Sequence, residues 1–246
     1  MTAKRSKPSS GGWRPGKEPI NLYRDDLREA LGRSGKTLAA MRRALNEHGA
    51  GVLDAPDETV KVWSDLHLGH ANIIAYQGRP FHDVHEMDGV LWANWQLGVD
   101  PEDTLVCVGD VAMGSGLTED TWERVRAAPG RTKVLVVGNH DVTGQGILRA
   151  GGFHRVKAVL TSPGDPPLIW THAPLPNVPA GHVNIHGHQH NALKSADSPH
   201  INVSVEQLDY RPVSLVRIRR LAKSLVAGDS LPGNTTLERI EAIRDE

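Results

Sequence analysis

Five short apolar segments of this sequence end in residues that commonly bind metal ions. They are residues 60–64 before Asp65 and His67, 104–108 before Asp110, 132–137 before Asn139, His140 and Asp141, 168–170 before His172, and 182–185 before His186, His188 and His190. The carboxyl ends of parallel strands lie at one edge of a sheet, so these side chains can converge. Carboxylate, amide and imidazole ligands together are typical of a transition-metal site. The pattern predicts an α/β fold built around metal ions.

Helical patterns separate the first three apolar segments. Residues 84–97 place Met87, Leu91 and Trp95 at helical spacing, and residues 118–127 form a second predicted helix with Thr118 as its cap. Alternating strands and helices predict parallel crossover connections. Further apolar runs then follow without helices between them, which predicts a second, mostly antiparallel sheet. These runs are 154–160, 168–171, 182–186, 200–205 and 213–218.

The rest of the sequence divides the chain into four parts. Residues 1–19 are basic and rich in Ser, Pro and Gly, which predicts a disordered arm. Residues 20–56 predict a helical extension, with a break at 32–35, Ser34 as a cap and a linker from residue 49. The main domain is expected at 57–218, and a polar C-terminal tail at 219–246 with a short helix at 235–244.

Composition limits the class of protein. A chain of 246 residues with 39% hydrophobic residues can form one domain with appendages. Its net charge of −1 creates no global attraction for nucleic acid. The single Cys107 has no disulfide partner, and we find no signal peptide and no membrane-spanning stretch. These features predict a cytoplasmic protein without a membrane partner, and leave its oligomeric state open.

The polar blocks resemble those of the calcineurin-like metallophosphoesterase superfamily, in the same order and over residues 65–190. The blocks are Asp65-x-His67, Gly109-Asp110, Gly138-Asn139-His140-Asp141, His172 and Gly187-His188-x-His190. The neighbourhood of His70, Arg79 and Asn94 resembles a small single-domain branch found in bacteria and phages, although Leu68 and Gln96 depart from its pattern. The resemblance implies a four-layer α/β/β/α sandwich of two mixed sheets, with the helical extension at its N-terminus.

The resemblance also implies a centre with two divalent metal ions, which can be Mn, Fe, Zn, Ni or Co, with Mn favoured. One metal ion would be bound by Asp65, His67, Asp110 and His190, and the other by Asp110, Asn139, His172 and His188. Asp110 would bridge the pair. A hydroxide between the two ions is the expected nucleophile.

Other residues near the blocks are expected to act on the substrate. His140 is the candidate that protonates the leaving oxygen, with Asp141 orienting its imidazole. His70 and Arg79 are candidates for contacts to the substrate phosphate, and His70 is equally compatible with supporting a metal ligand. His186 occupies a strand position and is expected to be structural.

The expected function is metal-dependent hydrolysis of a phosphoester, with a diester preferred over a monoester and a nucleotide or small molecule as substrate. One alternative is a nuclease or a phosphodiesterase for RNA ends or cyclic phosphates, recruited to nucleic acid by the basic arm. A second alternative is a non-catalytic scaffold of the same fold. Residues 27–45 also resemble a helix-turn-helix, against the simpler interpretation of an amphipathic helix pair packed on the domain.

Overall fold

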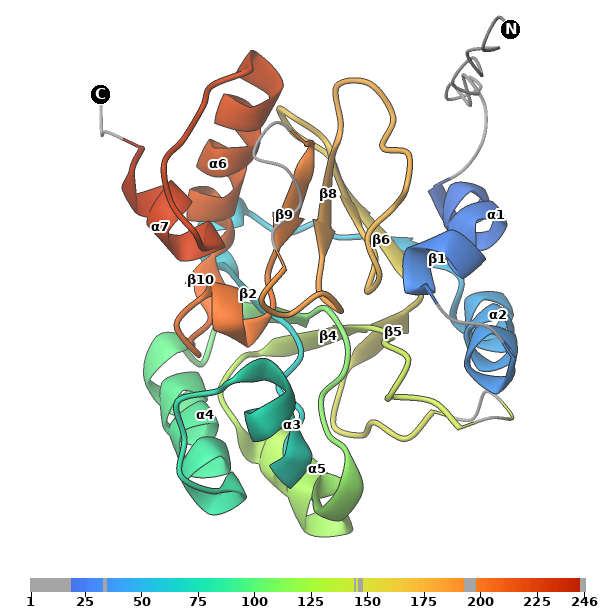
Figure 1. The fold of residues 1–246 in the computed structure, drawn as a ribbon, viewed down its shortest axis with the longest axis vertical. Helices are drawn as coiled ribbons and strands as arrows, with labels where there is room; N and C mark the ends of the chain where they lie inside the picture. Colours follow the sequence, from blue (N-terminus) through green and yellow to red (C-terminus); the bar gives the residue numbers. More distant parts are fainter. Residues whose placement is uncertain (1–18, 33–34, 144, 146–147, 193–197, 244–246) are drawn as a thin grey trace, which may run out of the picture.

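Two five-stranded mixed sheets form the centre of the molecule (Figure 1). The computed structural model describes residues 19–32, 35–143, 145, 148–192 and 198–243. The first sheet has the strand order β10 (Val213–Ser214), β2 (Val60–Trp63), β3 (Thr104–Cys107), β4 (Thr132–Val136) and β5 (Arg155–Lys157). The second sheet has the order β1 (Ala50–Val52), β6 (Val159–Ser162), β7 (Leu168–Trp170), β8 (Val183–His186) and β9 (His200–Asn202).

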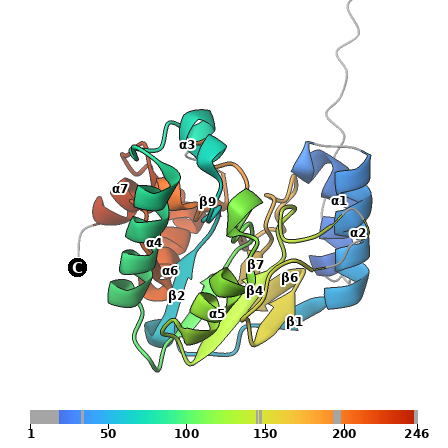
Figure 2. The same ribbon diagram turned by 90° about the horizontal axis from the view of Figure 1, so that it is seen from below.

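Helices cover the outer faces of both sheets (Figure 2). The first sheet is covered by α4 (Val84–Gly98) and α5 (Glu119–Ala127), and the second by α1 (Pro19–Leu31) and α2 (Lys36–His48). The remaining helices are α3 (Ala71–Gln77), α6 (Leu215–Ala227), α7 (Thr236–Glu241) and the 3-10 turns at Asp57–Thr59, Gly114–Gly116 and Val205–Gln207. The expected α/β sandwich of two mixed sheets is therefore confirmed.

Alternation along the strands explains why the sheets are covered on both faces. In β7, Leu168 and Trp170 join the large core that includes the first sheet, whereas Ile169 joins a separate apolar cluster with α1 and α2. Successive strand residues point to opposite faces, so one apolar strand contributes to two cores. On the other side of the molecule, the Trp63 ring of β2 meets the Trp95 ring of α4 edge-on, with ring centroids 5.3 Å apart.

The predicted crossovers are confirmed in the first sheet. Strands β2, β3 and β4 pair in parallel, and α4 and α5 connect them. Asp83 caps α4 by accepting the backbone N–H groups of His85 and Glu86, and Thr118 caps α5 as expected, by accepting that of Thr121. These caps set the residue at which each helix begins, and therefore where the preceding loop ends.

The prediction of a mostly antiparallel second sheet was wrong. Strands β7, β8 and β9 pair in parallel, and only β6 and β7 are antiparallel there. Residues 155–157 form β5, which extends the first sheet. Between β7 and β8, residues 171–182 return the chain to the same end of the sheet without a helix, which the spacing of apolar runs does not reveal.

Two predicted boundaries were also wrong. Residues 50–52 are not a linker but form β1, which pairs in parallel with β6 and joins the N-terminal helices to the second sheet. The predicted polar tail from residue 219 begins inside α6, which buries Ile218, Leu221 and Ala222 beside the β10–β2 edge. Arg and Lys residues separate the apolar residues of this helix in the sequence, so the average composition of the segment did not indicate a buried face.

The other predictions for the two ends are met in part. The short helix expected near residue 235 is present as α7, capped by Thr235. The basic arm, apart from Pro19, and the predicted cap Ser34 lie outside the described residues. Within the described part of the chain, no helix is long and apolar enough to cross a bilayer.

Replacing Leu221 by alanine tests whether α6 belongs to the folded core. Leu221 is fully buried, so Leu221→Ala should lower the free energy of unfolding in urea by about 2–5 kcal/mol. Val226 on the same helix is 49% exposed, and Val226→Ala should change it by less than about 0.5 kcal/mol. Equal stability of the two variants would place α6 outside the core.

Candidate metal centre

Two groups of ligand side chains lie at the carboxyl ends of the strands. The first ligand group contains Asp65, His67 and His190, and the second contains Asp110, His172 and His188. Within each group, one ligand atom from every residue lies within 4.8 Å of the others. Six of the seven predicted ligands lie in these two groups, although they come from segments up to 125 positions apart in the sequence.

Asp110 stands between the two groups. Its Oδ2 atom lies 3.2 Å from Nε2 of His172 in the second group and 3.7 Å from Nε2 of His67 in the first. Its other carboxylate oxygen accepts the backbone N–H of His140 at 2.8 Å. One oxygen of Asp110 therefore faces both groups, as a shared ligand must.

Buried polar atoms facing the groups lack hydrogen-bond partners. Nε2 of His67 and Oδ1 of Asn139 are both buried, and neither makes a hydrogen bond with any residue that the structure describes. A buried polar atom without a partner costs free energy, unless a ligand or a cation satisfies it. Both residues are expected metal ligands, so the donor set fits a pair of divalent cations.

The backbone of the ligand loops is strained. Asp65, His67, Asp110, His188 and His190 all have positive φ angles, between 46° and 68°. Non-glycine residues rarely adopt this conformation, and it persists where the surrounding structure enforces it, often at functional sites. Apart from these five ligands, the described non-glycine residues with positive φ are Asp209 and Tyr210.

Glycine is required where these loops approach each other. A Cβ atom on Gly187 would lie 2.2 Å from a carboxylate oxygen of Asp65, and one on Gly138 would lie 2.3 Å from a carboxylate oxygen of Asp110. Any larger residue at either position would displace an acidic ligand. The glycines of the sequence blocks therefore serve packing around the ligands.

In His172 and His190, the hydrogen bond of one ring nitrogen fixes which nitrogen faces the site. Nδ1 of His172 lies 2.7 Å from the carbonyl oxygen of Val108, and Nδ1 of His190 lies 2.9 Å from the Glu206 carboxylate. Each Nδ1–H therefore donates, and Nε2 is left for the site. Burial disfavours a charge on His172, but the adjacent Asp110 carboxylate outweighs burial and raises the pKa of His172 to about 10. A cation bound there would have to displace the His172 proton.

Asp141 does not orient the His140 imidazole, so that expectation was wrong. Its carboxylate accepts the backbone N–H groups of Asp110, Val111 and Gly138 at 2.8–3.0 Å. Burial, together with the charge of Asp110, raises the pKa of Asp141 to about 6. Asp141 therefore braces the loop that presents Asp110, a role that its position beside His140 in the sequence does not indicate.

Arg79 does not face a substrate site, and this expectation was also wrong. Its guanidinium is buried and donates to the Glu206 carboxylate and to the carbonyl oxygens of Asp65 and Leu66. Glu206 in turn accepts from Nδ1 of His190, and it was not among the predicted site residues. The only feature of the sequence that could have indicated Glu206 is that an acidic residue stands in an apolar stretch. Burial opposes its charge, but His190 and Arg79 outweigh burial and lower the pKa of Glu206.

The remaining candidate histidines differ in position. The side chain of His140 is 30% exposed, and its Nε2 lies 4.0 Å from Oδ2 of Asp110, so it borders the ligand groups and reaches solvent. Nδ1 of His70 lies 3.4 Å from Nδ1 of His67, which favours support of a ligand over contact with a substrate. His186 is buried, and its ring packs against that of His200.

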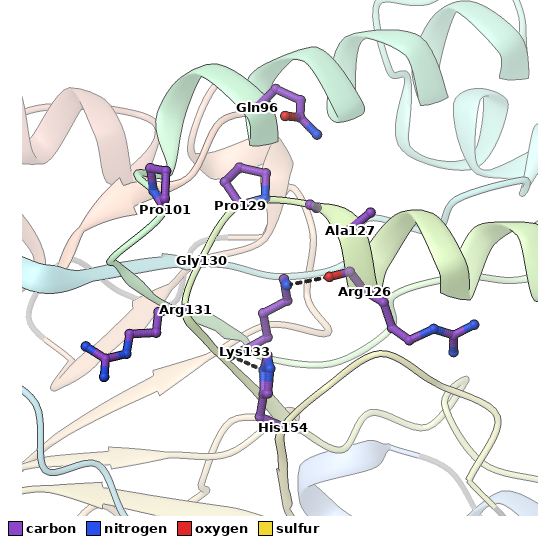
Figure 3. A pocket seen from close by; sticks show the side chains of 10 residues that line it. Gln96, Pro101, Arg126, Ala127, Pro129, Gly130, Arg131, Lys133 and His154 are labelled. Carbon is purple, nitrogen blue, oxygen red and sulfur yellow. Dashed lines mark hydrogen bonds between the residues drawn. The ribbon is translucent and has the colours of Figure 1, made fainter.

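A basic hollow of about 440 Å³ lies at the amino ends of β4 and β5, whereas the ligand groups lie at the carboxyl ends of the strands (Figure 3). Lys133 lines this hollow, and its ammonium donates to the carbonyl oxygen of Arg126 at the end of α5. A cation at a helix C-terminus is stabilising, which explains this buried lysine. The residues lining the hollow include no Asp or Glu, so it is no candidate for the metal centre.

Comparisons with known proteins give relatives without a stated activity. No family model matches the chain. Gene 66 protein of Mycobacterium phage L5 is 35% identical over 79 residues, which are 32% of this chain and 37% of that protein. Protein AQ665 from Aquifex aeolicus, a solved structure of unknown function, has a TM-score of 0.53 and 24% identity, and covers 66% of this chain and 98% of its own. That likeness supports the fold alone.

A longer match shows the family. The uncharacterized protein MJ1445 of Methanocaldococcus jannaschii is 34% identical over 164 residues, which are 64% of this chain and 88% of that protein. This chain therefore belongs to the same family as MJ1445.

Proposed function

We propose that this protein is a hydrolase of phosphoesters that uses two divalent metal ions, with the fold and chemistry of the calcineurin-like metallophosphoesterases. One observation carries the proposal: a single oxygen of Asp110 lies within 3.7 Å of a histidine from each ligand group. Two cations placed so close repel each other, and a shared carboxylate reduces that repulsion. A single-metal site or a structural site would not need this arrangement.

The bound cations and the side chains of the protein would have separate roles in hydrolysis. When bound, the two cations would supply an activated water and neutralise charge on the phosphoryl oxygens. The ligand types do not select one metal, and manganese is our first choice for assays. Asp65 holds the last ligand loop, because its carboxylate accepts the backbone N–H of His188 at 3.0 Å. The protein thus fixes the ligand geometry before any cation binds.

His140 is proposed to deliver a proton to the leaving oxygen. Its ring borders the first ligand group, 5.3 Å from the ring of His67, and its side chain is partly open to solvent. A group in this position can reach a bound ester and exchange its proton with water. Asp141 supports the backbone nearby without touching this ring.

The proposed substrate is a phosphodiester of a nucleotide or small molecule. A hydrolysis panel with Mn²⁺ tests this choice, using bis-nitrophenyl phosphate, nitrophenyl phosphate, 2′,3′- and 3′,5′-cyclic nucleotides, and single-stranded RNA and DNA. We expect turnover of diesters that EDTA abolishes and Mn²⁺ restores. No turnover of any ester with two Mn²⁺ bound would favour the scaffold alternative.

The nucleic-acid alternative depends on the basic arm. Lys4, Arg5, Lys7, Arg14 and Lys17 precede the described residues, whereas the apolar faces of α1 and α2 are buried against the domain. The packed helix pair therefore argues against a free helix-turn-helix, and any recruitment would fall to the arm. Removing residues 1–18 would separate these cases, because only a recruited nuclease would lose activity on polynucleotides and keep it on small diesters.

Asp110→Asn tests the shared ligand. It keeps the shape of the side chain but removes the charge, so hydrolysis should fall below detection and the protein should bind fewer than two Mn²⁺ by equilibrium dialysis. Asp120 is exposed on α5, and Asp120→Asn serves as the matched control with wild-type values. An Asp110→Asn protein with two tightly bound Mn²⁺ and full turnover would refute the bridging role.

His140→Ala tests proton delivery. Both cations should remain bound, while kcat should fall roughly 10²–10⁴-fold for esters with poor leaving groups. The loss should shrink for nitrophenyl esters, whose leaving oxygen needs no proton. His82, with a side chain 93% exposed, provides the control His82→Ala. An equal loss for good and poor leaving groups would remove His140 from this role.

A further inference from the structure

The two ligand groups are supported by different parts of the chain. We propose that the N-terminal hairpin, formed by α1 and α2, is a positioning element for the second ligand group and sets the affinity of the cation bound there. The inference rests on the proposed function, because it assumes that each group binds a cation. It concerns residues 19–48, which lie outside the segment 65–190 that contains the sequence blocks.

Tyr23 of α1 holds the loop that carries His172. Tyr23 is fully buried, and its hydroxyl oxygen accepts the backbone N–H of Ala173 at 3.2 Å. The carbonyl oxygen of Ala173 accepts the hydroxyl of Thr171 at 2.7 Å. Both backbone groups of the residue after His172 are therefore fixed, one of them by a side chain 150 positions away in the sequence.

The end of α1 contacts His188 directly. The last residue of the helix is Leu31, and its carbonyl oxygen lies 3.4 Å from Nε2 of His188. The last carbonyls of a helix have no partner within the helix and carry partial negative charge. This carbonyl favours the proton on Nε2, which leaves Nδ1 of His188 for a cation. Backbone carbonyls commonly orient metal-binding histidines in this way.

Apolar packing joins the hairpin to the loop 138–141, which contains Asn139. Val137 and Val142, on either side of the loop 138–141, are buried in the same cluster as Leu27, Met41 and Leu45 of the hairpin. That loop carries Asn139, the remaining expected ligand of the second cation. The hairpin thus contacts the surroundings of Asn139, His172 and His188.

The first ligand group is held from within the main domain. His190 bonds to Glu206, and Asp65 accepts the hydroxyl of Ser204 at 2.9 Å. The ring of His67 is adjacent to that of His70. Residues 19–31 and 35–48 make none of the hydrogen bonds described for Asp65, His67 and His190. Disturbing the hairpin should therefore weaken one cation and spare the other.

Tyr23→Phe provides the test, since it removes only the hydroxyl that accepts from Ala173. Titration with Mn²⁺ by calorimetry should show two sites in the wild type. In Tyr23→Phe, one dissociation constant should rise about 10–100-fold, the usual effect of losing an outer support, and the other should change less than about twofold. Tyr76 is 70% exposed, and Tyr76→Phe is the matched control with both constants unchanged.

Single-site backgrounds show which cation is affected. Combined with His190→Ala, which disables the first ligand group, Tyr23→Phe should still weaken the remaining cation. Combined with His188→Ala, it should have no effect. Leu27→Ala loosens the apolar packing of the hairpin and removes no hydrogen bond to a ligand loop. It should therefore repeat the pattern of Tyr23→Phe.

Each outcome has a distinct meaning. Folded Tyr23→Phe and Leu27→Ala proteins, checked by circular dichroism, with both Mn²⁺ constants within twofold of wild type would overturn the positioning role. Equal weakening of both cations would also overturn it, because the proposed asymmetry would be absent. A wild-type protein that binds fewer than two Mn²⁺ would contradict the proposed function itself, and this inference with it.

Discussion

The position of the Asp110 carboxylate is the constraint on which the rest of the site depends. A residue with a φ angle of 55° and a fully buried charge is unfavourable by itself. Asp141 compensates by accepting the backbone N–H groups of Asp110 and Val111, and Asp110 itself accepts that of His140. The carboxyl ends of β3 and β4 are thereby joined by hydrogen bonds, and Asp110 can face both ligand groups.

The sandwich makes this strain tolerable. Strands β2, β3 and β4 are almost wholly buried between apolar layers, so their ends are held in fixed relative positions. Loops attached to such a frame can adopt unusual backbone conformations whose cost the core offsets. The two ligand groups then differ in their outer support: Glu206 and Ser204 hold the first, whereas Tyr23 and the end of α1 contact the second.

Much of the fold was predictable because its strands are apolar and short. The ends of β2, β3, β4, β7 and β8 were located closely from the sequence, and so was Thr118, the cap of α5. Strand direction in the second sheet could not be predicted, because parallel and antiparallel strands have the same composition. The stripe of α6 was missed because Arg and Lys separate its apolar residues.

The site was predictable only in part, for a related reason. Ligands at strand ends follow from local sequence, but their supports depend on contacts over long separations. Arg79 meets Glu206 across 127 positions, and Tyr23 meets Ala173 across 150. Asp141 was assigned to the wrong partner because adjacency to His140 says nothing about which backbone amides its carboxylate accepts.

The most direct measurement is anomalous diffraction from crystals grown with Mn²⁺. The account predicts two anomalous peaks, about 3.5–4 Å apart, on either side of the Asp110 carboxylate. One peak should contact His67 and His190, and the other Asn139, His172 and His188. A single peak, or peaks remote from Asp110, would contradict it.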